Sequence, residues 1–86
     1  MTLHVLKTWH IPFNEIVNGS KRFEIRCNDR NFSVGDTLQL REWHHENGYT
    51  GRAIECAVTY IACGPDWGLP TGLVVMSLGP ALMVSP

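Results

Sequence analysis

Residues 19–27 read GSKRFEIRC, and this stretch decides the fold because the chain changes here from helical to strand periodicity. From Arg22 onward polar and apolar residues alternate with a period of two, which is typical of a half-buried strand. Glu24 and Arg26 then share the outer face of this strand. Lys21 joins them only if it precedes the strand, in an irregular segment after the glycine, and we expect that it does. The apolar set, which we expect to face the core, is Phe23, Ile25 and Cys27.

The residues before this stretch predict a short strand followed by a short helix. Residues 3–8 are β-prone. Pro12 is a good first helical residue because its missing N–H would be unpaired there anyway. Asn18-Gly19 is expected to end the helix after about two turns, since glycine accepts the left-handed conformation of a helix C-terminus. One buried stripe at helical spacing consists of Phe13, Ile16 and Val17.

Three further strands are predicted after this point. Residues 37–43 alternate, and Asn47-Gly48 after them is typical of a hairpin loop. Residues 52–62 form the longest predicted strand. Residues 64–70 contain two prolines and two glycines and are expected to form a loop, whereas the apolar run 73–78 fits a central strand covered on both faces. In the strands predicted at residues 37–43 and 52–62, the side chains expected to face inward are Leu38, Leu40, Ile54, Cys56, Val58 and Tyr60.

Five strands and one short helix after the first strand predict an α+β, mainly β domain. We expect the sheet to curl into a small barrel, because curling buries the core face and hides the edges. The domain is assigned to residues 1–79 and a loosely packed C-terminal tail to residues 80–86. A core of this size is thin, so a homodimer is a reasonable expectation.

The charge of the chain is small but unevenly spread. The net charge is −1, which excludes nonspecific nucleic-acid binding over the whole protein surface. Residues 1–30 carry five Lys or Arg against three Asp or Glu, whereas residues 31–86 carry two against five. A local basic face in the first third of the sequence is therefore allowed.

Cysteine and histidine usage favours a reduced, metal-free protein. Three cysteines without paired spacing argue against a disulfide scaffold, and residues 1–4 lack a signal-peptide pattern. Adjacent His44 and His45 cannot easily bind one ion, and no Cys-x-x-Cys pair exists, so neither metal nor cofactor is expected. Cys56 is expected to be buried and inert. Residues 72–84 are too short and too broken to span a bilayer. We expect a cytoplasmic protein without a membrane partner.

The ionisable groups at 21, 24 and 26 are the most informative chemistry in the sequence. Lys21 can donate to a phosphate or carbonyl oxygen, Arg26 can fork onto a planar acceptor, and Glu24 can accept from a base N–H. The alternative is a surface ion-pair ladder, which is common on exposed strands and contributes little. Spacing alone leaves both interpretations open.

The same residues carry a family resemblance. Gly19-x-Lys21-x-x-Glu24-x-Arg26 resembles the signature of ASCH domains, a branch of the PUA-like superfamily. The wider pattern is similar to the DUF3850 type of small bacterial and phage proteins over roughly residues 3–78. That pattern includes His4, Lys7, Asn28-Asp29-Arg30, Val34-Gly35-Asp36, Arg41-Glu42, Tyr49-Thr50-Gly51-Arg52 and Gly68-Leu69.

The resemblance implies a PUA-like barrel that binds single-stranded RNA or a modified nucleoside in a Lys/Glu/Arg cleft. It also raises an enzymatic alternative, since some small ASCH proteins are amidohydrolases of N4-acetylcytidine. Those enzymes use the motif lysine, a threonine where this chain has Glu24, and a glutamate before the last strand, where this chain offers only Asp66. Lys21 and Glu24 would be the catalytic residues of such an enzyme. A Lys–Glu pair suits ligand clamping better than base catalysis, because the carboxylate stabilises the ammonium. Binding is therefore favoured, and a phage-type protein-interaction module is a third class.

Other candidate ligand-binding residues flank this motif. His4 and Lys7 could face the cleft from the first strand, although a solitary histidine is equally a hydrogen-bonded structural residue. Asp29 and Arg30 either form a turn or bring Arg30 to a phosphate. Trp9, Trp43 and Trp67 could each stack on a base, with Trp67 the first candidate and Trp43 the second, while core packing is the alternative for at least one of the three.

Overall fold

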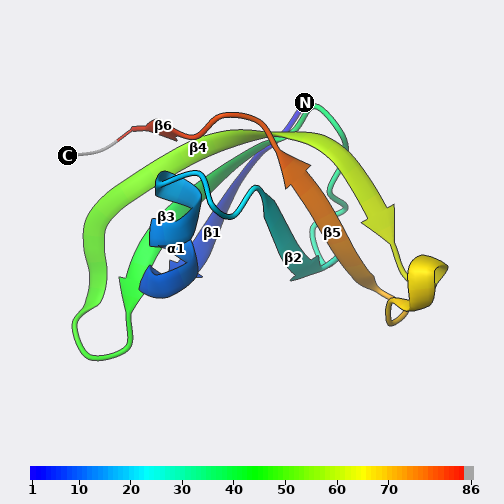
Figure 1. The fold of residues 1–86 in the computed structure, drawn as a ribbon, viewed down its shortest axis with the longest axis horizontal. Helices are drawn as coiled ribbons and strands as arrows, with labels where there is room; N and C mark the ends of the chain where they lie inside the picture. The colour runs from blue at the N-terminus through cyan, green and yellow to red at the C-terminus, as the bar shows by residue number, and fades with distance from the viewer. Residues whose placement is uncertain (85–86) are drawn as a thin grey trace.

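The computed structural model describes residues 1–84, so the last two residues of the expected tail lie outside the described part (Figure 1). The chain begins with strand β1 (Leu3–Trp9) and helix α1 (His10–Val17), followed by strand β2 (Phe23–Cys27). A hairpin of β3 (Thr37–His44) and β4 (Gly48–Cys63) leads through a 3₁₀ turn, η1 (Asp66–Gly68), to β5 (Leu73–Leu78) and β6 (Leu82–Met83). The domain is α+β and mainly β, as the sequence predicts.

The strands form one curved sheet that remains open. Its order is β1-β3-β4-β5-β2, and β6 pairs with β4 beside this path. β1 and β3 run parallel, whereas every other pair is antiparallel. Figure 1 shows β4 arching over the molecule, with α1, β1 and β3 under one half of the arch and β2 and β5 under the other. Because β1 and β2 end the path of paired strands without pairing with each other, the closed barrel expected from the sequence is wrong.

The core lies on the concave side of this sheet, against α1. Leu38 and Leu40 of β3 are fully buried, as predicted, and Val17 is 39% exposed although the helix stripe predicted it to be buried. From α1 the core takes Phe13 and Ile16. The buried cluster further includes Leu6, Phe32, Ile54, Cys56, Val58, Val74, Met76 and Leu78.

Helix α1 begins at His10, two residues earlier than predicted, and follows β1 without an intervening loop. Pro12 therefore lies in the first helical turn, where backbone N–H groups have no partner within the helix. Gly19 follows the helix end with φ +87°, the left-handed conformation expected for a glycine at this place. The chain then reaches Lys21, whose backbone N–H donates to the carbonyl of Glu15.

A buried carboxylate attaches α1 to the sheet. Glu42 of β3 is 4% exposed, and it accepts hydrogen bonds from Thr50 Oγ1 (2.7 Å) and Asn14 Nδ2 (3.3 Å). Arg52 Nη1 lies 3.4 Å from the same carboxylate and 3.3 Å from Asn14 Oδ1. A buried charge is tolerated where such partners surround it, and these partners hold α1 against the β3–β4 hairpin.

The side of β2 that is buried is opposite to the one predicted. Glu24 is 5% exposed, whereas Phe23 and Ile25 are 42% and 50% exposed. The reason is the pairing with β5, in which Glu24 lies opposite the fully buried Met76, and partners across an antiparallel pair share one face of the sheet. Register with a neighbouring strand, not the alternation within β2, decides which side of this strand is buried.

Two smaller expectations also fail on the same half of the sheet. Tyr60 is 63% exposed because β4 shifts register between Val58 and Tyr60. Beyond this shift the residues that had been expected to face the core point to the other side of the sheet. β5 buries Val74, Met76 and Leu78, but its other face stays partly exposed, so it is not covered on both sides.

Within residues 1–84, no helix has the length and apolar character that crossing a membrane requires.

Candidate functional site

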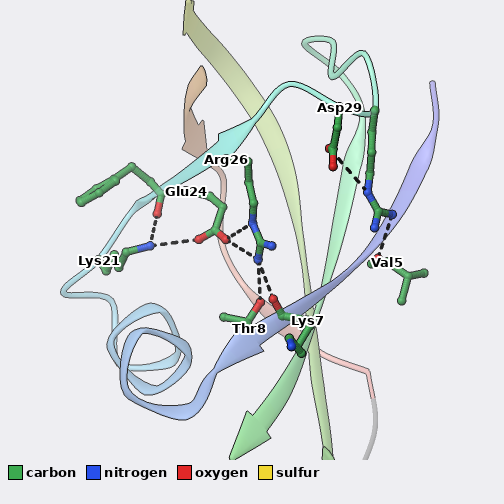
Figure 2. A network of polar contacts seen from close by, with 9 residues as sticks. Val5, Lys7, Thr8, Lys21, Glu24, Arg26 and Asp29 are labelled. Atoms are coloured by element: carbon green, nitrogen blue, oxygen red, sulfur yellow. Dashed lines mark hydrogen bonds and ion pairs between the residues drawn. The ribbon is translucent and has the colours of Figure 1, made fainter. Parts of the chain in front are cut away.

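The two ends of the open sheet, β1 and β2, are bridged by arginine side chains from the β2 side. Arg26 Nη2 donates to the carbonyl oxygen of Lys7 (2.9 Å) and lies 3.3 Å from Thr8 Oγ1. Arg30 Nη1 donates to the carbonyl oxygen of Val5 (3.1 Å). Figure 2 shows the guanidinium group of Arg26 reaching across to β1. We call the gap between the unpaired strands β1 and β2 the seam. In a closed barrel, backbone N–H groups of a neighbouring strand would bond the carbonyl groups of β1, and here guanidinium groups do so instead.

Glu24 is the centre of the polar network at the seam. Its Oε1 accepts a hydrogen bond from Lys21 Nζ (3.0 Å), and its Oε2 accepts one from Arg26 Nε (2.7 Å). Lys21 Nζ also donates to the carbonyl oxygen of Phe23 (2.7 Å). In Figure 2 the carboxylate lies between the two cations, which approach it from opposite sides. The irregular segment after Gly19 thus brings Lys21 to Glu24 and Arg26, although all three face the seam and not the outer surface of a strand.

A cleft of about 390 Å³ opens above this network. Three cations line it, Lys7, Lys21 and Arg26, against the single carboxylate of Glu24. Thr8 adds a hydroxyl, and the apolar part of the wall consists of Trp9, Pro12 and Ile25. The cleft is therefore electropositive, with apolar surface in part of its wall.

Several N–H groups of these cations are available to a ligand. Lys21 uses two acceptors, Phe23 O and Glu24 Oε1, which leaves one proton of its ammonium group. Within residues 1–84, Arg26 bonds through Nε and Nη2 and makes no hydrogen bond through Nη1. Lys7 holds its ammonium 4.4 Å from the centre of the Trp43 ring. Side chains of Lys21 and Arg26 are 21% and 26% exposed, so solvent reaches both.

His4 does not line the cleft. It is 5% exposed, packs on Phe32, and its Nε2 lies 2.8 Å from Oδ2 of Asp36 in a hydrogen bond. Asp36 also accepts bonds from the backbone N–H groups of Thr2 (3.0 Å) and Ser33 (2.9 Å). These hydrogen bonds, that of His4 first, lower the pKa of Asp36 to about 2. His4 and Lys7 lie on opposite faces of β1, and His4 belongs to a structural pair that fixes the N-terminus.

Asp29, Arg30 and Trp67 also lie outside the cleft lining. The side chain of Asp29 is 73% exposed, with its carboxylate 4.0 Å from Arg30, which bridges the seam. Asn28, not Asp29, accepts the backbone hydrogen bond of this turn, from Phe32 N (3.0 Å). Trp67 is 82% exposed in η1, which in Figure 1 follows the end of β4 away from α1.

The cleft also contains residues that sequence reasoning missed. Thr8, Pro12 and Ile25 were not among the candidate ligand-binding residues, and Trp9 ranked below Trp67 and Trp43 as a stacking candidate. A signal for Trp9 was present in the sequence, since it follows Lys7 at the two-residue period of β1. Using it required the parallel pairing of β1 with β3, which local patterns do not contain.

Cysteines and histidines do not build a metal centre in the described residues. No group of three His, Cys, Asp or Glu side chains within 1–84 could hold an ion. Cys56 is 2% exposed, and burial, together with the nearby charge of Glu24, raises the pKa of its thiol to about 11. Cys27 and Cys63 are free and exposed.

Fold and site together define a small, mainly β domain with a cation-lined cleft at the seam of an open sheet. The chain belongs to the family described as "Domain of unknown function (DUF3850)", which matches residues 3–78, from β1 to β5 and including the whole cleft. It is similar to the "Uncharacterized 12.9 kDa protein in GpA 3'region" of Escherichia phage P2, with 38% identity over 65 residues. That alignment covers 76% of this chain and 59% of the phage protein, so the chain matches less than two thirds of that relative's length.

Proposed function

We propose that this domain binds single-stranded RNA or a modified nucleoside in the cleft at the seam. The observation that carries the proposal is the convergence of Lys7, Lys21 and Arg26 on one cleft with a single carboxylate. Donors at Lys21 Nζ and Arg26 Nη1 suit phosphate or base carbonyl oxygens, since charge-assisted hydrogen bonds to anionic oxygens are the stronger kind. The apolar part of the wall suits the face of a base.

Glu24 has a different role in this proposal from the one the sequence suggests. Both of its carboxylate oxygens are engaged by cations, and it is 5% exposed. We assign it to holding Lys21 and Arg26 in place, not to reading a base edge. A fixed pair of donors loses less conformational entropy on binding than two mobile side chains would.

The proposal also covers the superfamily of the domain and its location in the cell. The Gly19-x-Lys21-x-x-Glu24-x-Arg26 motif supports a relationship to ASCH and PUA-like domains, in a form whose sheet stays open and is bridged by side chains at the seam. The free cysteines support a reducing, cytoplasmic location. A homodimer remains a prediction, which sedimentation equilibrium at two protein concentrations would test.

Binding is favoured over hydrolysis of N4-acetylcytidine by what surrounds the motif lysine. Lys21 donates to Glu24 and to a backbone carbonyl, so it is arranged as an ammonium donor and not as a base. Asp66 belongs to η1 and does not line the cleft. Incubation of the protein with N4-acetylcytidine should release no cytidine, and turnover that disappears in Lys21→Ala would replace binding by catalysis as the function.

The decisive experiment compares matched charge variants. Fluorescence anisotropy would measure binding of labelled single-stranded RNA 10-mers, and NMR titration would measure binding of cytidine and N4-acetylcytidine. Lys21→Ala and Arg26→Gln should each weaken binding about tenfold, the loss of one charged hydrogen bond to a ligand. Arg22→Gln removes an exposed charge beside the cleft and should leave affinity unchanged.

Equal affinities in Lys21→Ala and the parent would reject the proposed site. Absence of binding to every RNA and nucleoside would reject the proposed function. A pull-down from cell lysate with and without ribonuclease would then identify a protein partner by its resistance to the nuclease.

A further inference from the structure

A row of aromatic rings lies beside the cleft, on the outer side of β1 and β3. Trp9 and Trp43 are register partners in this parallel pair, and their rings meet edge to face with centres 5.4 Å apart. His45 from the hairpin loop lies nearly parallel to Trp9, at 22° and 6.0 Å. His44 stacks on His45 at 19° and 4.8 Å. We call Trp9, Trp43, His44 and His45 the aromatic row.

The aromatic row is not part of the core. Trp9 is 51% exposed, and the side chain of His45 is 54% exposed. None of the four residues belongs to the buried cluster. Rings that stack on one another while remaining half exposed offer π-faces to solvent, and large exposed aromatic surface is characteristic of binding sites.

The aromatic row is continuous with the cleft. Trp9 belongs to both, since it forms part of the cleft wall. Lys7 also links them, because it lines the cleft while its ammonium lies over the ring of Trp43. The ammonium group of Lys7 thus lies between the cleft and the aromatic row, the two places where a base could be held. The phosphate that joins two nucleotides would lie at this position.

We propose that the aromatic row is a second subsite, which stacks the base next to the nucleotide held in the cleft. The ligand class is then single-stranded RNA of two or more nucleotides, and not a free nucleoside. This inference rests on the proposed function of the cleft. Lys7 contacts the connecting phosphate, and Trp9 presents the first stacking face. Aromatic stacking accepts any base, so the second subsite adds affinity without strict sequence preference.

The test compares ligands of different length on the same variants. Isothermal titration would measure binding of cytidine 5′-monophosphate, the dinucleotide and an RNA hexamer to the parent, Trp9→Ala and His45→Ala. The parent should bind the hexamer at least tenfold more tightly than the mononucleotide. His45→Ala lies outside the cleft wall, so it should weaken hexamer binding severalfold and leave mononucleotide binding unchanged.

Trp9→Ala should weaken hexamer binding about tenfold, a larger factor than for the mononucleotide, as expected for loss of a base stack. Trp9→Phe keeps a π-face and should restore most of the hexamer affinity if the alanine variant folds poorly. Trp67→Ala removes an indole that is more exposed than that of Trp9 and does not line the cleft, and it serves as the control. Quenching of tryptophan fluorescence by the hexamer should fall markedly in Trp9→Ala and persist in Trp67→Ala.

The outcomes separate the two proposals. Equal losses for hexamer and mononucleotide in Trp9→Ala, with no effect of His45→Ala, would overturn the second subsite while the cleft stands. Tighter binding of the matching DNA hexamer would overturn RNA as the ligand class. Absence of binding by all ligands would reject the cleft function, and the second subsite with it.

Discussion

At Glu24, one carboxylate receives hydrogen bonds from two cations and is almost excluded from water. Removing such a charge leaves its partners facing each other without compensation, which is more costly than the net contribution of an exposed ion pair. Lys21 and Arg26 are partly solvated, which moderates the cost. We therefore expect this side chain to be important for the stability of the part of the seam that Arg26 bridges.

Glu24→Gln should lower the free energy of unfolding by about 1–3 kcal/mol, since a neutral amide cannot balance both cations. Urea unfolding followed by circular dichroism would measure this change. Glu46→Gln is the matched control, because the Glu46 side chain is 72% exposed and its loss should matter little. A Glu24 variant as stable as the Glu46 variant would contradict the central role given to this carboxylate.

The residues of the cleft could be predicted in part from the sequence. The spacing of Lys21, Glu24 and Arg26 is local, and it placed these three groups near one another. Their direction is not local, because it depends on Glu24 lying opposite Met76 of β5. The contact of Trp9 with Trp43 was not predicted for the same reason, since it follows from the β1–β3 register. Spacing along the chain indicates which groups are neighbours, but register between strands decides what they face.

At the scale of elements, helix and strand positions follow closely from sequence periodicity. The hairpin at Asn47-Gly48, the strand 73–78 and the short helix ending before Gly19 all agree with the structure. The closed barrel was wrong because closure requires β1 and β2 to pair, and side chains of β2 fill the seam instead. The register shift after Val58 exposes Tyr60, and an alternating pattern cannot reveal where an irregular residue interrupts it.

The loop between β4 and β5 offers a test at this scale. A Cβ atom at Gly64 would lie 1.7 Å from the carbonyl oxygen of Pro70, so any side chain forces the backbone apart. Gly64→Ala should lower the free energy of unfolding by about 2–3 kcal/mol, the range expected for overpacking against rigid surroundings. Thermal unfolding would measure it.

Gly68→Ala is the comparison within the same loop. Its added Cβ meets nothing within 4 Å, and only the positive φ of 73° makes the alanine unfavourable. The cost should then be about 1 kcal/mol. Equal destabilisation by the two substitutions would mean that the close packing of Gly64 on Pro70 does not exist in solution.

At the scale of the whole molecule, Asp36 ties the N-terminus to the turn before β3. The lowered pKa of Asp36, about 2 against 3.8, means that the unfolded chain takes up this proton before the folded chain does as pH falls. The contribution of Asp36 to stability is therefore present above about pH 4, and it is lost as the pH falls towards 2.

Asp36→Asn should remove this part of the acid sensitivity. The difference in free energy of unfolding between parent and variant should shrink as the pH falls from about 4 towards 2, measured by urea unfolding across that range. Asp29→Asn, at a side chain that is 73% exposed, should follow the parent throughout. A difference that does not change with pH would rule out the proposed proton linkage.

The seam has a further consequence for how the cleft adapts to what enters it. In a closed barrel the strand number and tilt fix the diameter, so widening any opening breaks ladder hydrogen bonds. Here much of the cleft wall comes from the two free margins of a single bent sheet, which the side chains of Arg26 and Arg30 join. A slight flattening of the arch changes the aperture while every strand keeps its neighbours. Among the hydrogen bonds described for residues 1–84, those from Arg26 and Arg30 to β1 are the ones that such a change would require to be remade.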